Sequence, residues 1–339
     1  MADRKLRWGV LGCAGIAYRA HVPAMQQSLS SQFAAVASRD FEKARKWADE
    51  FGCRAIPGYE ELLADPDIDA IYNPLPHGLH AEWTIKALHA GKHVLCEKPM
   101  ALNAQQAQTM LDAARATGKL LFEAFMYRFN PRILQAVELV RSGRIGRVLL
   151  IRSAFSFELN RPNDHRWAVE HGGGALMDVG CYCVNISRLF ANAEPARVSA
   201  MMELLPGTEQ SGFPVDRSTT AVLDFGPVKA TFSSRFDTSH DGQFCEVVGS
   251  TARLRLDRPF AAAQNPTIVI GDEVIDCPTA NQYALQAEAF AQAALAGSTS
   301  VAGLTPDAAD AVANMAVLDA LRASAVSGAS QAVQYQGTN

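Results

Sequence analysis

Short apolar runs and amphipathic segments of helical period alternate along the first 125 residues. The runs that predict strands lie at 6–11, 33–37, 68–72, 93–96 and 120–122, and the segments that predict helices lie at 16–27, 41–51, 79–90 and 104–116. Strands and helices that alternate at this spacing are joined by right-handed crossovers, which make the sheet parallel and cover both of its faces with helices. Residues 1–124 are therefore predicted to form one doubly wound α/β domain.

The pattern changes from residue 125 onward. A predicted helix at 132–141 is followed by long β-rich runs at 147–159, 197–205, 218–225, 228–236, 244–248 and 254–257. Short turns, which typically join antiparallel strands, occur at Gly226-Pro227, Gly249-Ser250 and Gly271-Asp272. Two alanine-rich helices close the chain, one at 283–295 before Gly297 and one that begins at Thr305-Pro306-Asp307. Residues 125–339 are predicted to form an α+β domain with a large, mostly antiparallel sheet.

Composition narrows the class of protein. The chain has 339 residues, enough for two domains at about 150 residues each, and 48% of them are hydrophobic. With 31 Lys and Arg against 35 Asp and Glu, the net charge of −4 supplies no basic field for nucleic acid or anionic lipid. No apolar run approaches the roughly 20 residues of a membrane span. Seven scattered cysteines without a C-x-x-C pair indicate reduced thiols and no metal site. We therefore expect a cytoplasmic protein without nucleic-acid or membrane partners.

The first predicted strand leads into a small-residue turn with the pattern G-x-A-x-x-A. Its expected contacts to a dinucleotide are Gly12, Cys13, Ala14, Gly15 and Ile16. Small residues at these positions let backbone amides and a helix amino terminus approach a pyrophosphate, as in Rossmann-type domains. Taken alone, the pattern is equally that of an ordinary tight strand-to-helix turn. Its position at the first strand of a βαβ series favours the dinucleotide site.

The end of the second predicted strand bears on which dinucleotide binds. An NAD site usually has a carboxylate at this point, which holds the ribose 2′-hydroxyl and would repel a 2′-phosphate. Here Ser38 and Arg39 follow the strand, and both side chains suit a phosphate. Asp40 is the alternative, because a shift of one residue makes it the NAD-type acid. The sequence favours NADP over NAD.

Three segments gather ionisable groups, two of them at strand ends where a doubly wound sheet binds ligands. After the run at 68–72 and the run at 93–96, the expected cofactor contacts are Asn73, Pro74, Leu75, His77, His80, Glu97 and Lys98. In the second domain, a glycine-rich stretch precedes Asp178 and Tyr182, which share one face if a helix begins there. Without context, a lysine after a strand is usually solvated, and a helical tyrosine usually belongs to the core.

Together these segments resemble the Gfo/Idh/MocA oxidoreductase family over nearly the entire chain. The resemblance rests on the glycine turn, on Glu97-Lys98-Pro99, on the stretch at 172–180 and on the change from a Rossmann to an antiparallel domain. Many members carry histidine four residues after the aspartate. Tyr182 stands there instead, as in the subgroup of aldose and dihydrodiol dehydrogenases, to which the segment 123–129 is also similar.

The resemblance implies that Lys98 and Tyr182 carry the proton chemistry and that Asp178 positions substrate or tyrosine. A free tyrosine with a pKa near 10 is a poor base at neutral pH, and an ammonium beside it favours the tyrosinate. The expected substrate contacts are Lys98, Arg128, His165, Arg166, Trp167, Asp178 and Tyr182. Residues 161–167 offer a sugar polar groups and an apolar platform, although the same residues also suit a solvated loop. The family's fold further implies a homodimer or homotetramer formed through the second sheet.

The function expected from the resemblance is NADP-dependent hydride transfer with an aldose or a related cyclic polyol. One variant retains its cofactor and couples the oxidation of one sugar to the reduction of another. Two alternatives remain, a trans-dihydrodiol dehydrogenase and a non-catalytic NADP-binding sensor. A sensor does not need the lysine or the acid-base residue, and both are present at Lys98 and Tyr182.

Overall fold

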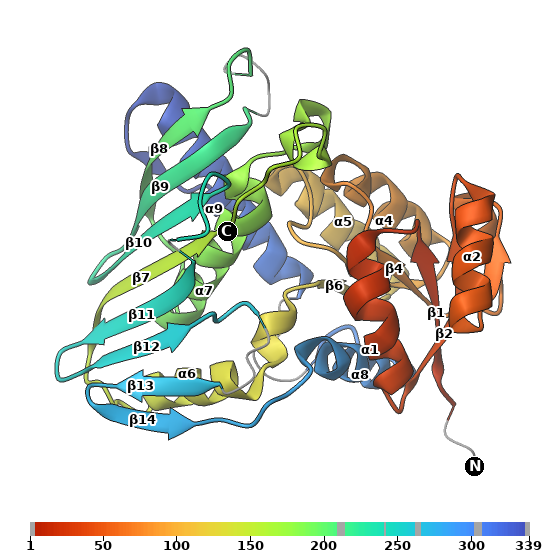
Figure 1. The fold of residues 1–339 in the computed structure, drawn as a ribbon, viewed down its shortest axis with the longest axis horizontal. Helices are drawn as coiled ribbons and strands as arrows, with labels where there is room; N and C mark the ends of the chain where they lie inside the picture. Colours follow the sequence, from red (N-terminus) through yellow and green to blue (C-terminus); the bar gives the residue numbers. More distant parts are fainter. Residues whose placement is uncertain (1–3, 209–213, 241, 262–265, 302–306, 336–339) are drawn as a thin grey trace. The chain divides into compact units, whose positions relative to one another are not determined.

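The computed structural model describes residues 4–208, 214–240, 242–261, 266–301 and 307–335 (Figure 1). The chain divides into two compact units. The first unit contains residues 1–101, 105–129 and 281–311, and the second contains 102–104, 130–280 and 312–339. The predicted domain boundary at residue 124 differs from this division, because a segment near the end of the chain belongs to the first unit.

The first unit is built on a parallel sheet of six strands in the order β3-β2-β1-β4-β5-β6. Its strands are β1 (Leu6–Leu11), β2 (Ser31–Ala37), β3 (Arg54–Ile56), β4 (Ala70–Asn73), β5 (His93–Cys96) and β6 (Leu121–Glu123). Its helices include α1 (Val22–Gln27), α2 (Phe41–Phe51), α3 (Tyr59–Ala64), α4 (His80–His89), α5 (Ala104–Thr117) and α8 (Gln282–Leu295). The predicted doubly wound sheet is confirmed, while β3 and α3 were not predicted. The predicted helix at 16–27 contains a π-helical turn, η1 (Ala17–His21), before α1.

Helix α8 completes the core of the first unit. The ring of Phe290 lies 4.8 Å from that of Trp8 on β1 and 6.0 Å from that of Phe122 on β6, measured between centroids. The carboxylate of Glu288 accepts hydrogen bonds from the hydroxyls of Ser28 and Ser30 at 2.6 Å each. Figure 1 shows α8 beside α1, which it contacts. These contacts explain why residues 281–311 group with the first unit.

The second unit contains a sheet of nine strands in the order β14-β13-β12-β11-β7-β10-β9-β8-β15. Its strands are β7 (Val148–Ser156), β8 (Arg197–Leu204), β9 (Asp216–Phe225), β10 (Val228–Arg235), β11 (Gln243–Gly249), β12 (Arg253–Asp257), β13 (Thr267–Ile270), β14 (Glu273–Asp276) and β15 (Gln331–Ala332). All described pairs are antiparallel except β7 with β10, so the predicted mostly antiparallel sheet is confirmed. The three predicted turns join β9 to β10, β11 to β12 and β13 to β14.

The second unit also contains α6 (Pro131–Arg141), α7 (Cys181–Ala191) and most of α9 (Ala308–Ser327). Helix α7 packs on β7 and β10. Side chains alternate along β9 and β10, where Leu223 and Phe232 are buried while Val222 is 45% exposed. Thr305 and Pro306, predicted to begin the last helix, lie outside the described residues. Asp307 does act there, since its Oδ1 accepts a hydrogen bond from the Asp310 amide at 2.8 Å.

Three properties of the described residues concern membranes, metal ions and disulfides. None of their helices is long and apolar enough to cross a membrane. None of their His, Cys, Asp and Glu side chains form a group of three or more that suits a metal ion. None of the seven cysteines, all of which lie among these described residues, forms a disulfide within the chain, and four of them are buried.

Candidate active site

The predicted nucleotide turn lies at the carboxyl end of β1, beside β4. The strand order reverses between β1 and β4, which is the crevice where doubly wound sheets bind dinucleotides. Gly12 has φ +79°, a conformation that glycine adopts without strain. A Cβ at this residue would lie 3.1 Å from Cδ2 of Leu75 and 3.2 Å from the Tyr59 hydroxyl. A side chain at this turn would be strained by the positive φ and crowded by Leu75 and Tyr59, so glycine suits the turn, as the tight turn of a dinucleotide site requires.

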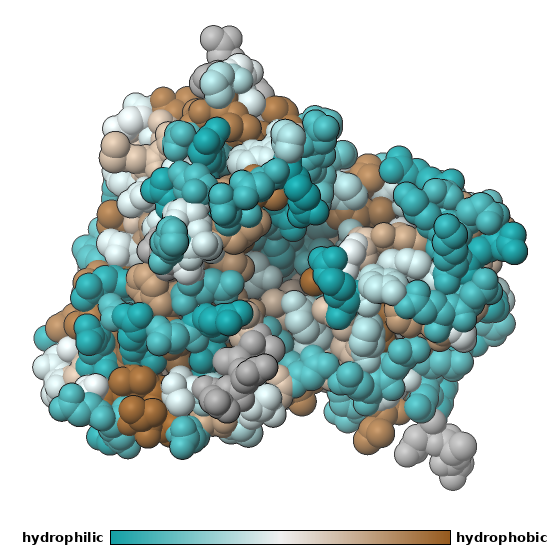
Figure 2. All heavy atoms as spheres, viewed as in Figure 1, coloured by the Kyte–Doolittle hydropathy of each residue, from teal (hydrophilic) through white to brown (hydrophobic). Residues whose placement is uncertain are grey.

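The residues at the tip of β2 bear on the alternative between Ser38 and Asp40. Asp40 is the N-cap of α2, where its carboxylate accepts a hydrogen bond from the Lys43 amide at 3.4 Å and lies 3.7 Å from the Lys43 ammonium. The Ser38 hydroxyl accepts a hydrogen bond from the Asp40 amide at 3.1 Å, and Arg39 is exposed. Because a helix N-cap engages its carboxylate locally, Asp40 has the role of a structural cap. Figure 2 shows hydrophilic residues over α2 on the viewed face.

The loop after β4 is held by two of its own predicted site residues. The Asn73 side chain donates to the Thr84 hydroxyl at 3.1 Å, and its Oδ1 accepts from the Leu75 amide at 3.3 Å. The buried ring of His80 has Nε2 2.7 Å from the Leu75 carbonyl oxygen and Nδ1 3.0 Å from that of Pro99. His80 thus lies in the interior, in contrast to the expected contact with cofactor. The His77 ring, also buried, lies 5.6 Å from the His80 ring.

Glu97 forms a buried network directly before Lys98, at the end of β5. Its carboxylate accepts hydrogen bonds from the Tyr72 hydroxyl at 2.6 Å and from the Lys98 amide at 3.2 Å, and lies 3.1 Å from Nε2 of His21. Burial acts to raise the pKa of Glu97, but the adjacent His21 ring, the charge of Lys98 and the Tyr72 hydroxyl lower it to about 2. Glu97 is therefore a carboxylate that organises the backbone at Lys98. The peptide between Lys98 and Pro99 is cis.

In the second unit, the glycine-rich stretch leads into the predicted helix. Gly174 has φ +108°, and a Cβ there would lie 2.3 Å from Oδ1 of Asp216. Both oxygens of Asp216 accept from the Leu176 amide, at 3.1 and 3.0 Å, and Oδ2 also accepts from the Thr219 hydroxyl at 2.7 Å. Burial raises the pKa of Asp216 to about 6. The helix begins with a π-helical turn, η6 (Leu176–Gly180), so the α-helical spacing expected for Asp178 and Tyr182 is interrupted.

Asp178 and Arg166 form an ion pair within the second unit. Nε of Arg166 donates to Oδ2 of Asp178 at 2.6 Å, and the same guanidinium lies 3.1 Å from Oδ1 of Asp164. The charge of Asp178 raises the pKa of Arg166. His165 is exposed and has Nδ1 3.2 Å from Asp164. The structure therefore connects three of the predicted substrate contacts through acidic side chains.

Tyr182 and Trp167 both lie among aromatic rings of the second unit. The Tyr182 ring is 5.3 Å from that of Phe155 and 5.1 Å from that of Phe260, and Tyr182 is 5% exposed. The Trp167 ring meets that of Phe236 edge-on at 5.2 Å. The packing accounts for the orientation of both large rings.

Arg128, predicted as a substrate contact, is buried in the first unit. Its guanidinium lies 3.1 Å from Oδ2 of Asp310. Such a buried pair needs both partners, because removing one leaves an uncompensated charge. The position of Arg128 thus fits a structural ion pair.

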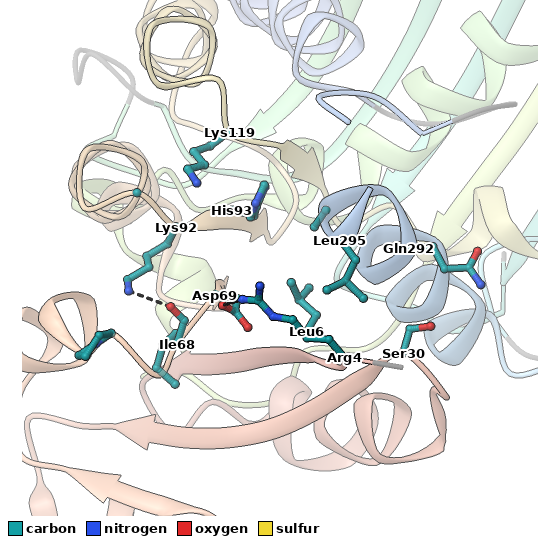
Figure 3. Close-up of a pocket in the computed structure, with 13 residues that line it drawn as sticks. Arg4, Leu6, Ser30, Ile68, Asp69, Lys92, His93, Lys119, Gln292 and Leu295 are labelled. Atoms are coloured by element: carbon teal, nitrogen blue, oxygen red, sulfur yellow. Dashed lines mark hydrogen bonds and ion pairs between the residues drawn. The ribbon is translucent and has the colours of Figure 1, made fainter. Parts of the chain in front are cut away.

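A separate cavity of about 770 Å³ opens at the amino ends of the same parallel strands (Figure 3). The ammonium of Lys92 donates to the Asp65 and Ile68 carbonyl oxygens at 2.6 and 2.8 Å, and Arg4 pairs with Asp69 at 2.8 Å. This cavity lies at the edge opposite the strand ends where doubly wound sheets bind dinucleotides, so we do not assign the cofactor to it.

Comparisons with known proteins connect this geometry to a family. A model described as "Oxidoreductase family, NAD-binding Rossmann fold" matches residues 6–125, and the model of the GFO/IDH/MocA C-terminal domain matches residues 133–255. The chain is 39% identical over 334 residues to D-xylose 1-dehydrogenase (NADP(+)) 2 of Haloferax volcanii, a match that covers 96% of this chain and 98% of that protein. The chain belongs to the Gfo/Idh/MocA oxidoreductase family.

Solved structures resemble this Gfo/Idh/MocA chain over nearly its full length. KijD10, a 3-ketoreductase from Actinomadura kijaniata solved with NADP and TDP-benzene, has a TM-score of 0.86 at 33% identity and covers 95% of this chain and 98% of its own. The aldose-aldose oxidoreductase from Caulobacter crescentus has a TM-score of 0.87 at 25% identity and covers 97% of this chain and 100% of its own. The chain is an NAD(P)-dependent oxidoreductase.

The sequence of this Gfo/Idh/MocA member did not predict every residue that supports the site. His21, Tyr72 and Asp216 lie far along the chain from the groups they hold. A histidine in a helix and a tyrosine in a strand carry no local signal of a shared carboxylate. Only the fold, which brings the end of β5 beside that of β4, shows that Glu97 joins His21 and Tyr72.

Proposed function

We propose that this chain is an NADP-dependent dehydrogenase of an aldose or a related cyclic polyol. The observation that carries the proposal is the position of Lys98, two residues after the end of β5, the strand that pairs with β4 at the crevice between β1 and β4. A doubly wound sheet binds its dinucleotide in that crevice. The engagement of Asp40 as a helix cap supports NADP, because Ser38 and Arg39 are then left for the 2′-phosphate.

Lys98 and Tyr182 are proposed as the catalytic residues. When bound, the nicotinamide exchanges a hydride with the substrate carbon. The phenolate of Tyr182 takes the hydroxyl proton as the carbon is oxidised, and returns it when the carbonyl is reduced. An ammonium favours the phenolate form of a tyrosine beside it, which is the proposed role of Lys98. Both residues also contact the sugar hydroxyl in this proposal.

The substrate side of the site is proposed to be built around Asp178. Its carboxylate is held by Arg166 at 2.6 Å, so its orientation is fixed before a sugar arrives. A carboxylate accepts hydrogen bonds from sugar hydroxyls, and the neighbouring His165 and Trp167 add a polar group and an apolar ring. Arg128 is left out of the proposed substrate contacts, since it pairs with Asp310.

A direct assay tests this function. Purified protein is mixed with NADP or NAD and a panel of aldoses, inositols and a trans-dihydrodiol, and reduced nicotinamide is followed by absorbance. We expect signal with aldoses and NADP. Signal with NAD alone would contradict the assignment of Ser38 and Arg39 to a 2′-phosphate. Signal with the dihydrodiol alone would contradict the proposal that the substrate is a sugar.

Silence across the panel would contradict a freely exchanging dehydrogenase. The denatured protein is then examined for released dinucleotide. Released NADP together with turnover of a sugar pair, one oxidised and one reduced, would indicate the variant with retained cofactor. NADP binding without turnover of any pair would indicate a sensor.

A further inference from the structure

The ring of His80 lies between two backbone carbonyl groups. Nε2 is 2.7 Å from the oxygen of Leu75, and Nδ1 is 3.0 Å from the oxygen of Pro99. The side chain is completely buried at the start of α4. Burial lowers the pKa of His80. The two carbonyl contacts and the charge of Glu97 act to raise this pKa, but the effect of burial is larger.

Which of these contacts are hydrogen bonds depends on which ring nitrogens carry a proton. A carbonyl oxygen only accepts hydrogen bonds, so a ring nitrogen bonds to it only as a donor. A neutral imidazole has one N–H and donates to one carbonyl at a time, whereas an imidazolium donates to both. An unmade bond at a buried group is costly, so the two carbonyls favour a second ring proton, whereas burial disfavours it.

The two carbonyls belong to the two segments that the proposed function depends on. Leu75 lies in the loop after β4, and its amide is held by Asn73 at 3.3 Å. Pro99 directly follows Lys98, whose own amide is held by Glu97 at 3.2 Å. The ring of His80 is thus one link between the nucleotide loop and the lysine segment.

We propose that His80 is a positioning residue whose ring N–H holds the Pro99 carbonyl, next to Lys98, in one tautomer and the Leu75 carbonyl, in the nucleotide loop, in the other. The inference rests on the proposed function, because it concerns the same lysine and the same cofactor. It assigns His80 to the framework of the site, where it contacts neither substrate nor nicotinamide.

Two substitutions separate the two links. The amide nitrogen of asparagine occupies the position of Nδ1, so His80→Asn keeps the donor to Pro99 and loses the donor to Leu75. The amide nitrogen of glutamine reaches the position of Nε2, so His80→Gln keeps the donor to Leu75 and loses the donor to Pro99. A structural role without positioning would make the two variants alike.

We expect each variant to impair a different quantity by about five- to tenfold, which is the effect of losing one neutral hydrogen bond. His80→Asn raises the Kd for NADP, measured by fluorescence titration, relative to His80→Gln. His80→Gln lowers kcat relative to His80→Asn. His89→Gln is the matched control, since His89 is exposed at the other end of the same helix, and it should change neither quantity.

A readout independent of turnover completes the test. ¹⁵N-labelled wild-type protein should show a slowly exchanging imidazole N–H that disappears in both His80 variants and persists in His89→Gln. Equal losses of affinity and kcat in folded His80→Asn and His80→Gln, or the absence of this resonance, would overturn the proposal. If wild type turns over no substrate, the proposed function fails, and the NADP affinities and the resonance still decide the role of His80.

Discussion

Lys98 is the side chain on which the proposed chemistry depends most directly. We expect Lys98→Ala to lower kcat by about two to four orders of magnitude, the usual contribution of proton transfer by a positioned group. NADP binding should persist, because the nucleotide turn at Gly12 and the tip of β2 are unchanged. Initial rates and fluorescence titration measure the two effects. Lys46→Ala, on the exposed face of α2, is the control and should leave both unchanged.

Tyr182→Phe removes only a hydroxyl. The ring that packs against Phe155 and Phe260 is kept, so the melting temperature should stay within about 2 °C of wild type. We expect kcat to fall by about two to four orders of magnitude through loss of the proton carrier. A variant with near wild-type kcat would show that another group carries the proton.

His93 makes stability depend on pH in the acid range. Burial, together with the charge of Lys119, lowers its pKa to about 4, below the ordinary value of about 6.5. Between about pH 6.5 and about pH 4, the unfolded chain binds a proton at His93 that the folded chain does not bind. The stability of the folded state therefore falls as the pH drops through this range. Its Nδ1 accepts from the Leu120 amide at 3.1 Å, and the amide oxygen of His93→Asn can accept the same bond. The variant should lose less melting temperature between pH 7 and pH 4.5 than wild type does, and an equal loss would contradict this assignment.

At the scale of elements, Gly174 determines how the helix that carries Asp178 and Tyr182 begins. Gly174→Ala forces a side chain into φ +108° and against Asp216, so we expect a loss of about 1–3 kcal/mol in the free energy of unfolding. Denaturant titration measures it. Gly226→Ala is the control, because Gly226 also has positive φ, at +79°, but meets no atom within 4 Å. Equal losses in the two variants would show that the contact with Asp216 costs nothing.

Elements with a clear period were predictable from the sequence, and short or unusual ones were not. β1, β2 and β5 follow from short apolar runs, and the hairpins of the second sheet follow from glycine turns between β-rich runs. β3 has three residues and α3 has six, which is too short for a period to show. The π-helical turns at 17–21 and 176–180 leave the apolar pattern of an α-helix nearly intact.

Some features of the candidate site were likewise predictable from the sequence, and others were not. The glycine turn and Glu97-Lys98-Pro99 are local patterns, so the sequence sufficed to locate them. The predicted helix at 41–51 has the same bounds as α2, but the sequence does not show whether the Asp40 carboxylate caps that helix or turns toward a ribose. The ring of His80 between two carbonyls depends on the packing of α4 against two loops, which no spacing in the sequence contains.

At the scale of the whole molecule, the outer face of the second sheet bears on assembly. Met201 on β8 is 81% exposed and Val222 on β9 is 45% exposed, and the strand register places both on one face. We expect a homodimer or homotetramer formed through this face. Met201→Glu with Val222→Asp should shift the mass measured by light scattering toward the monomer. Leu29→Glu, at an 83% exposed site in the first unit, is the control. An unchanged mass in the double variant would place the interface elsewhere.

The position of α8 also determines when the first unit is completed during synthesis. A ribosome makes Trp8 and Phe122 long before Phe290, although the three rings pack together in the finished protein. Part of the core of the nascent nucleotide-binding unit therefore stays uncovered until nearly 300 residues have emerged from the ribosome. The second sheet is translated during this interval. The unit that begins the chain is thus the one whose folding is finished late, and a fragment ending near residue 130 would leave the ribosome without the helix that closes it.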